Sequence, residues 1–136
     1  RVAQFESGGG GLMSTALDYA RFCAMLAGGG ALGKERIIGP MTLEFMASDH
    51  LGPHVKRGSD LLPAGHGFGL GFAVRTAPGM TFVPGSEGLY YWGGIAGTTF
   101  WIDPQEDLFA LMMIQAPGQR DYYRMLFRTL VYAAVE

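Results

Sequence analysis

The segment whose pattern says most about the fold runs Tyr90-Tyr91-Trp92-Gly93-Gly94-Ile95-Ala96-Gly97-Thr98-Thr99-Phe100-Trp101-Ile102-Asp103-Pro104. Aromatic and β-branched residues are typical of strands, so it predicts one strand over 89–92 and another over 98–102, joined by glycines. Those glycines allow a second molecule to lie along the strand edge, where a freed backbone N–H can donate a hydrogen bond to it. A glycine-bulged hairpin without any chemistry would carry the same pattern.

The sequence on either side predicts two more strands. Residues 68–75, Phe-Gly-Leu-Gly-Phe-Ala-Val-Arg, predict an earlier strand whose glycines allow another backbone to approach closely. Residues 103–107 predict a hairpin turn with a proline at its second position, and residues 108–115 predict the strand that follows. Because that last run is apolar throughout, we expect a central strand or one covered on both faces.

Helices are expected before and after these strands. A helix over 15–26 would begin at Thr15, whose spacing to Asp18 fits a capping box, with Ser14 as the alternative N-cap. Pro40 favours the start of a second helix over 40–47. An irregular loop is expected over 48–67 and a last helix over 119–135. This order indicates an α+β fold, an antiparallel sheet flanked by helices.

Length and composition fit one domain, with no internal boundary in residues 1–136. The chain is 49% hydrophobic and 16% charged, with a formal net charge of −2, which excludes disorder. Its pI of about 5.9 argues against nucleic-acid binding through a basic surface. Cys23 is the single cysteine, so no disulfide can form within the chain. The longest apolar run, 108–114, is too short to span a membrane.

Low charge combined with many aromatic residues would leave a small free-standing domain with much apolar surface. The sequence starts at Arg1, with neither an initiator methionine nor a secretory signal pattern. We therefore expect the C-terminal portion of a larger globular protein, with a processed complete domain as the alternative. One cysteine is compatible with a reducing compartment and favours the cytoplasm; the periplasm and secretion are left open.

The residue spacings do not require a metal or a cofactor. His50 and His54 are four residues apart, a spacing that holds a metal only on a helix, and Gly52 and Pro53 lie between them. The run Ser7-Gly8-Gly9-Gly10-Gly11-Leu12 lacks the Gly-Lys-Ser/Thr that binds phosphate. We expect no metal site and no cofactor.

The spacings that activate a serine nucleophile are also missing. The chain contains no Gly-x-Ser-x-Gly elbow and no Ser-x-x-Lys, in which the lysine lies one helical turn after the serine. The five serines, Ser7, Ser14, Ser48, Ser59 and Ser86, are followed three residues later by Gly10, Leu17, Leu51, Leu62 and Leu89. No nucleophile–base pair is therefore expected in the chain.

Two groups of charged residues receive structural interpretations. Arg120, Arg124 and Arg128 lie at i, i+4 spacing on the last helix and predict a solvated face. The apolar residues of that helix, Tyr123, Phe127, Leu130 and Ala134, lie on another face. Asp103, Glu106 and Asp107 cluster at the predicted hairpin, and we interpret them as turn residues rather than as paired catalytic acids.

Four segments, taken in order, resemble the C-terminal part of the serine hydrolases with the class C β-lactamase fold, and most closely the family VIII carboxylesterases. They are residues 7–15 (Ser-Gly-Gly-Gly-Gly-Leu-Met-Ser-Thr) leading into the helix with Asp18 and Tyr19, 67–72 (Gly-Phe-Gly-Leu-Gly-Phe), 91–94 (Tyr-Trp-Gly-Gly) and 97–104 (Gly-Thr-Thr-Phe-Trp-Ile-Asp-Pro). The resemblance covers nearly the whole chain.

The resemblance implies a catalytic site built from three motifs. A Ser-x-x-Lys supplies nucleophile and base, a tyrosine motif assists proton transfer, and a third motif lies on the strand beside the site. That third motif is typically Lys-Thr-Gly in β-lactamases and often Trp-x-Gly in the esterases. Trp92-Gly93-Gly94 matches the third motif. Ile95 falls where the family's strand N–H completes the oxyanion hole.

On this resemblance, the catalytic group of the chain is the backbone N–H of Ile95. The substrate-binding residues are Trp92, Gly93, Gly94 and Tyr91, with Tyr90 and Tyr91 equally open to a packing role. The first two motifs would lie in the missing N-terminal part of the same protein, so we expect this chain alone to be inactive.

The implied function is hydrolysis of a small-molecule carboxylic ester through a serine acyl-enzyme. A lysine in the third motif can pair with the carboxylate of a β-lactam, whereas the indole of Trp92 offers an apolar wall and one N–H. We therefore expect neutral esters to be preferred over anionic β-lactams. The alternatives are an acyltransferase or β-lactamase of the same fold, or a non-catalytic binding module.

Overall fold

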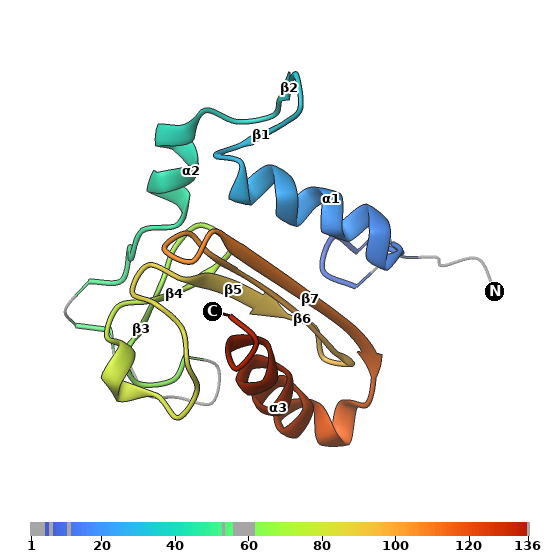
Figure 1. Cartoon of the computed structure of the whole chain (residues 1–136), viewed down its shortest axis with the longest axis vertical. Helices are drawn as coiled ribbons and strands as arrows, with labels where there is room; N and C mark the ends of the chain where they lie inside the picture. Colours follow the sequence, from blue (N-terminus) through green and yellow to red (C-terminus); the bar gives the residue numbers. More distant parts are fainter. Residues whose placement is uncertain (1–4, 6, 11, 53, 56–61, 136) are drawn as a thin grey trace.

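The structure, a computed structural model, describes residues 5, 7–10, 12–52, 54–55 and 62–135; Gly11 of the glycine run lies outside them. A five-stranded antiparallel sheet contains, in chain order, β3 (His66–Phe68), β4 (Ala73–Arg75), β5 (Tyr90–Gly93), β6 (Gly97–Asp103) and β7 (Leu108–Gln115). Helices α1 (Ala16–Ala27) and α3 (Arg120–Tyr132) lie on opposite sides of the sheet (Figure 1). The predicted α+β fold is confirmed.

The first helix begins as the sequence predicts. The Thr15 hydroxyl accepts a hydrogen bond from the Asp18 amide at 3.2 Å and donates to the Asp18 carboxylate at 2.9 Å, which completes the capping box. Helix α2 (Pro40–Met46) has the predicted proline in its first turn. The short hairpin between them, β1 (Ala31–Leu32) and β2 (Glu35–Arg36), was not predicted. Single 3₁₀ turns, η1 (Pro78–Met80) and η2 (Pro117–Gln119), complete the elements.

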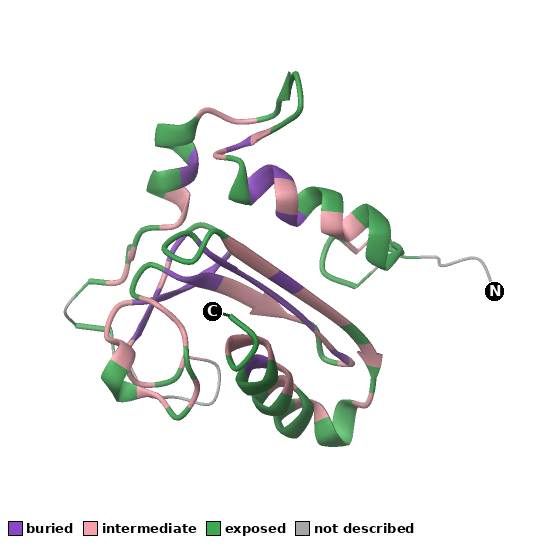
Figure 2. Cartoon of the chain, in the orientation of Figure 1, coloured by how far each residue is buried: buried purple, intermediate pink, exposed green. Residues whose placement is uncertain are grey.

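The two faces of the sheet pack against different clusters. On the α1 side, one buried cluster joins Cys23, Met25, Leu26, Leu43, Phe72, Val74, Tyr90, Phe100 and Ile102. On the α3 side, a smaller cluster joins Leu89, Trp101 and Ala110, with Phe127, Val131 and Tyr132 of α3 packed against it. Burial is accordingly greatest in the central strands, while the outer faces of both helices are exposed (Figure 2).

The predicted strand over 68–75 is wrong. Residues 69–72 instead form the turn between β3 and β4, closed by a hydrogen bond of 2.8 Å from the Gly69 amide to the Phe72 carbonyl. Gly71 has a φ of +96°, a conformation open to glycine at low cost. The alternating pattern was therefore a hairpin of two three-residue strands.

For residues 108–115 the sequence left open a central strand or a strand covered on both faces; the first is wrong, and the second holds in part. In the described part of the chain β7 is the last strand of the sheet and pairs only with β6. Helix α1 packs over β6 and β7 on one face, and Ala110 joins the α3-side cluster on the other. The residues of β7 are apolar because both faces are partly covered, even though the strand lies at the edge.

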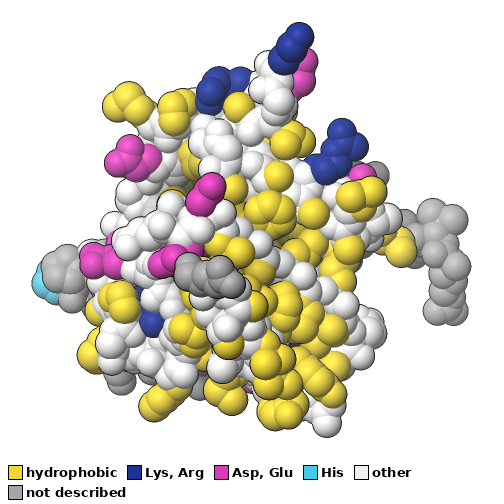
Figure 3. All heavy atoms as spheres, in the orientation of Figure 1, with side chains coloured by type: hydrophobic (Ala, Val, Ile, Leu, Met, Phe, Trp, Pro, Cys, Tyr) yellow, Lys and Arg dark blue, Asp and Glu magenta, His cyan; other side chains and the backbone are white. Residues whose placement is uncertain are grey.

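The rotation of α3 differs from the prediction of a solvated arginine face. Successive residues are about 100° apart around a helix, so Arg124 and Arg128 lie on the same stripe as Phe127 and Val131. That stripe faces the sheet: Arg128 is 7% exposed, whereas Leu130 is 59% exposed. Hydrophobic side chains consequently gather on the outer surface where α3 lies (Figure 3). None of the helices in the described residues has the length and hydrophobicity that a membrane span requires.

Candidate functional site

The free edge of β5 is the centre of the candidate site. Neighbouring residues of an antiparallel strand direct their N–H and C=O groups to opposite sides. The Gly94 amide donates to the Thr98 carbonyl at 2.8 Å, on the β6 side. Gly93 therefore faces the other edge, where the pairing of β4 with β5 ends at Tyr91. Ile95 lies beyond the strand, in the turn between β5 and β6 that the Gly97 amide closes by donating to the Gly94 carbonyl at 3.1 Å. Among the described residues, the Ile95 amide donates no backbone hydrogen bond, and the residue is 77% exposed.

A cavity of about 550 Å³ lies beside this edge. Its lining includes all five residues that the sequence singled out: Tyr91, Trp92, Gly93, Gly94 and Ile95. The remaining lining residues come from α3 and from the loop before β3, and they are Arg120, Asp121, Arg124 and Pro63. We refer to this cavity as the β5 cleft. Its volume falls in the range typical of small-molecule sites.

Arg124 supports the wall of the β5 cleft from α3. Its guanidinium Nη2 donates to the Gly94 carbonyl at 2.5 Å and to the Thr98 carbonyl at 3.1 Å. A Cβ added to Gly93 would lie 2.5 Å from that Nη2, so the approach of Arg124 to the strand requires glycine at position 93. The tandem glycines therefore have different roles, because a Cβ at Gly94 would meet no atom closer than the Thr98 Cβ at 4.0 Å.

The charges at the cleft are largely paired. The Asp121 carboxylate lies 3.8 Å from Arg124 Nη1 and 3.6 Å from Arg120 Nε, and its side chain is 83% exposed. Burial lowers the pKa of Arg124, while Asp121 opposes that shift. The guanidinium nevertheless stays charged, because its ordinary pKa is so high.

Tyr91 and Trp92 lie on opposite faces of the sheet. The Trp92 ring packs edge-on against Phe68, with ring centroids 5.1 Å apart. The Tyr91 ring lies under the Arg128 guanidinium at 5.0 Å and beside the His66 ring at 5.4 Å. Burial raises the pKa of Tyr91, partly offset by Arg128 and two further arginines. The phenol is therefore protonated at neutral pH and accepts no proton there.

The hairpin carboxylates lie away from the cleft lining. Asp103 is fully buried and accepts hydrogen bonds from the Gln105 amide at 3.3 Å, the Ser86 amide at 3.0 Å and the Tyr132 hydroxyl. The Ser86 hydroxyl donates to Glu106 at 3.4 Å. The interpretation of Asp103 as a turn residue is confirmed by its bond to Gln105, and the residue also ties β6 to α3.

His50 and His66 have backbone partners, and the described histidines do not gather into a ligand cluster. In the described part of the chain no group of three His, Cys, Asp or Glu side chains is placed to hold a metal ion. His50 Nε2 lies 2.6 Å from the Phe45 carbonyl, and His66 Nδ1 lies 3.1 Å from the Ala64 carbonyl. Both rings therefore have local backbone partners.

Sequence reasoning missed the contribution of α3 to the site. Arg124 was assigned to a solvated face because the apolar residues of the helix, Tyr123 and Leu130 among them, indicate a different packing stripe. The signal that was available is the position of Val131 and Phe127 on the stripe with Arg124 and Arg128, where an arginine beside apolar neighbours is a candidate for burial.

A family profile described as Beta-lactamase matches residues 1–133. Protein Rv1367c of Mycobacterium tuberculosis (strain ATCC 25618 / H37Rv) is 41% identical over 117 residues, which cover 82% of this chain and 29% of that protein. The chain thus spans less than a third of the length of the curated relatives it matches.

Two solved structures superpose on most of this chain. EstCE1, described as a hydrolase with promiscuous acyltransferase activity, superposes with a TM-score of 0.72 at 28% identity, covering 86% of this chain and 29% of its own. Simvastatin synthase (LovD) from Aspergillus terreus superposes with a TM-score of 0.63 at 22% identity, covering 85% of this chain and 32% of its own. The second similarity concerns the fold alone.

Proposed function

The chain belongs to the beta-lactamase family, and from this premise we propose that residues 1–136 are the C-terminal portion of a single serine carboxylesterase domain. The nucleophile and its base belong to the part of the domain outside these residues, since none of the five serines is followed by a lysine at the required spacing. This chain supplies the strand along which the substrate lies.

The reaction proceeds in two acyl-transfer steps. The serine oxygen bonds to the ester carbonyl carbon, and the bond from that carbon to the alcohol oxygen breaks, with the serine proton leaving on the alcohol. Water then attacks the acyl-enzyme, which releases the carboxylic acid and returns the proton to the serine. Each step develops negative charge on the carbonyl oxygen, which the Ile95 amide stabilises together with a second backbone donor. Such a donor contributes about 3–4 kcal/mol to lowering the barrier.

The observation that carries the proposal is the free Ile95 amide beside the β5 cleft. Its neighbour Gly94 is bonded to β6, whereas Ile95 lies in the turn after β5, where its amide has no backbone acceptor among the described residues and the residue is 77% exposed. Trp92 contributes apolar lining to the cleft, and the absence of a side chain at Gly93 lets the Arg124 guanidinium reach the strand. A free backbone amide beside a cleft fits acyl chemistry, in which amide donors stabilise the oxyanion.

The expected substrates are neutral esters. Trp92 occupies the third-motif position at which a lysine would pair with an anionic substrate. Of the two arginines that line the cleft, Arg124 already donates to two backbone carbonyls, and both face Asp121. The intact protein should hydrolyse p-nitrophenyl butyrate faster than a chromogenic cephalosporin. Faster turnover of the cephalosporin would reverse the assigned preference.

Active-site labelling tests the location of the nucleophile. Treating the intact protein with a fluorophosphonate should stop ester hydrolysis and leave one adduct, which mass spectrometry would place on a serine outside residues 1–136. An adduct on one of the five serines of this chain would contradict the assignment. Full inactivity with no adduct would favour a non-catalytic binding module.

A substitution at Gly94 tests the role of the strand. Gly94 lines the β5 cleft, and the Cβ of Gly94→Val would meet nothing closer than 4.0 Å, so we expect kcat/KM to fall about 100-fold with the fold intact. Gly118→Val is the matched control, because its Cβ also meets open space and Gly118 does not line the cleft. Near-normal turnover of Gly94→Val would remove the role assigned to this edge.

Acyl transfer is the second candidate activity. It is favoured by the likeness to EstCE1, whose description combines hydrolase and acyltransferase activity. Adding 1-butanol to the ester assay distinguishes the two, since transfer would yield the butyl ester in place of the free acid. Product analysis that finds only acid across a range of butanol concentrations would leave hydrolysis as the activity.

A further inference from the structure

A second cavity, of about 460 Å³, lies on the α3 side of β5 and adjoins the β5 cleft. The two share Tyr91, Asp121 and Arg124 among their lining residues. We call it the Arg128 pocket, after the buried arginine in its lining. The other residues that it does not share with the β5 cleft include Met80, Phe82, Val83, Trp101 and Met125. The proposed ester chemistry does not use Arg128.

Arg128 is a buried cation on the sheet-facing side of α3. It is 7% exposed, and its guanidinium carbon lies 5.0 Å from the Tyr91 ring centroid and 4.9 Å from that of Trp101. Within the described residues, its guanidinium has neither a hydrogen bond nor an ion pair. Burial lowers the pKa of Arg128, but guanidinium groups stay charged in proteins. The rings fix its position through cation–π contacts and leave its donors unused.

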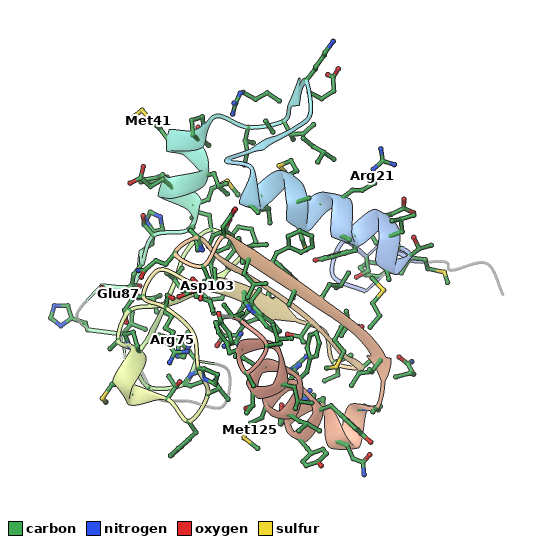
Figure 4. All side chains as sticks on the ribbon, in the orientation of Figure 1. Arg21, Met41, Arg75, Glu87, Asp103 and Met125 are labelled. Atoms are coloured by element: carbon green, nitrogen blue, oxygen red, sulfur yellow. The ribbon has the colours of Figure 1, made fainter. Side chains whose placement is uncertain are left out.

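A second buried arginine shows what a purely structural role looks like. Arg75 is 2% exposed, and its Nη1 donates to the Pro84 carbonyl at 2.9 Å. Its Nη2 donates to the Pro78 carbonyl at 2.8 Å and the Val83 carbonyl at 2.9 Å. Arg75 thus lies inside the loop that follows β4 and holds it in place (Figure 4). Because that loop forms one wall of the Arg128 pocket, the pocket is already shaped before any ligand enters.

The charges around the pocket compensate Arg128 only in part. The buried Asp103 carboxylate favours its charged form but accepts hydrogen bonds from other groups, and Arg75 opposes the charge. Asp121, the acidic residue of the lining, is directed to Arg120 and Arg124 and is 83% exposed. His66 is 2% exposed, and burial lowers its pKa, so it contributes no positive charge at neutral pH. An anion entering the pocket would therefore meet one desolvated guanidinium, and burying an ion is costly unless it is paired.

We propose that the Arg128 pocket binds a small molecule that carries a carboxylate on an apolar chain. The guanidinium fork matches a planar carboxylate through two parallel hydrogen bonds. The methionine, phenylalanine and valine side chains of the wall match an apolar chain, and the volume suits a molecule of that size. This inference stands apart from the ester hydrolase assignment, because it concerns binding and not turnover.

Calorimetric titration of the intact protein tests the inference with octanoate as the probe and 1-octanol as its neutral counterpart. Octanoate should bind at least tenfold more tightly than 1-octanol. Arg128→Gln should lower the affinity for octanoate at least tenfold and abolish the preference for octanoate over 1-octanol. Arg21→Gln is the matched control, since Arg21 is exposed on α1 across the sheet; it should leave both affinities unchanged.

A second variant keeps the test decisive if Arg128→Gln does not fold. Phe82 lines the pocket and is fully exposed, so Phe82→Glu adds a negative charge at the rim without disturbing the core. This variant should lower the affinity for octanoate several-fold and leave the affinity for 1-octanol nearly unchanged. Equal affinities for octanoate and 1-octanol, or octanoate binding that neither variant weakens, would overturn the proposal. Tighter binding of inorganic sulfate than of octanoate would also overturn it.

Discussion

The two faces of the sheet differ in the kind of side chain that they bury. On the α1 side the buried side chains are apolar and meet one another, as Phe100 does with Tyr19, Phe22 and Phe72 at ring-centroid distances of 5.4, 6.3 and 6.3 Å. On the α3 side, buried polar groups lie among the apolar ones: Arg75, Arg128 and Asp103. The α1 face provides stability, whereas the α3 face also positions polar groups beside two cavities.

The contrast follows from the side chains that each helix packs against the sheet. Helix α1 presents Cys23 and Leu26, which need no partner beyond close packing. Helix α3 presents Arg124 and Arg128 on the stripe that faces the strands. Because a buried polar group is costly unless it is paired, its position is more tightly specified than that of an apolar one. Substitutions on the two faces should therefore differ in kind, and the following predictions are ordered by size.

The largest effect is expected from Phe100→Ala on the α1 face. Phe100 is 6% exposed and contacts three aromatic rings, so truncation should lower the free energy of unfolding of the intact protein by about 3–5 kcal/mol. Denaturant titration measures the change. Met41→Ala is the control, because Met41 is 82% exposed and labelled on the outer side of α2 (Figure 4). A loss similar to that of Met41→Ala would refute the packing role.

Asp103→Asn should have the next largest effect, on the α3 face. The amide cannot accept from the Ser86 amide, the Gln105 amide and the Tyr132 hydroxyl as the carboxylate does. The expected loss is about 2 kcal/mol, because buried donors lose a charged acceptor. Asp107→Asn serves as the comparison, since Asp107 is exposed and asparagine tolerates its φ of +48°. Equal stability of the two variants would remove the difference between the faces.

A pH-dependent effect of intermediate size is expected from Cys23. Burial raises the pKa of its thiol from 9.0 to about 11. The folded state therefore holds this proton more tightly, so the stability contributed is fully present below pH 9 and is lost as the pH rises toward 11. The stability advantage of the wild type over Cys23→Ala should shrink by about 1 kcal/mol between pH 8 and pH 10. An advantage that stayed constant with pH would show that the thiol is not buried.

The smallest effect should come from the tandem glycines. Gly93→Ala would displace the Arg124 guanidinium from the Gly94 carbonyl, whereas Gly94→Ala would meet open space. Unfolding measurements should show a loss of about 0.5–1 kcal/mol for the first variant. The second should be nearly neutral. A larger loss for Gly94→Ala than for Gly93→Ala would mean that the contact of Arg124 with the strand does not require glycine at position 93.

Much of the fold followed from local pattern. The Thr15–Asp18 spacing predicted the start of α1, and the residues around the tandem glycines predicted the hairpin of β5 and β6. Such features depend on neighbours in the chain and can be read from a short window. The site residues Trp92, Gly94 and Ile95 came instead from the resemblance to the serine hydrolases; all three line one cavity, and their roles stay predictions.

Other features depended on contacts between distant segments. The turn at Gly71 was missed because alternating residues fit one long strand as well as two short ones. The rotation of α3 was missed because Leu130 suggested a packing surface that the sheet does not use. Arg128 is buried because Tyr91 and Trp101 from two strands enclose it, and no local rule brings those rings together.

The position of β7 at the edge of the sheet has a consequence for handling the protein. In the described residues its outer row of backbone groups has no neighbouring strand, and six of its eight residues, LFALMMIQ, carry large apolar side chains. An unprotected edge of this kind is a template for strand addition by another copy. A preparation of residues 1–136 by itself would therefore self-associate and precipitate on concentration. A lysine introduced midway along that outer row would act as a gatekeeper against aggregation.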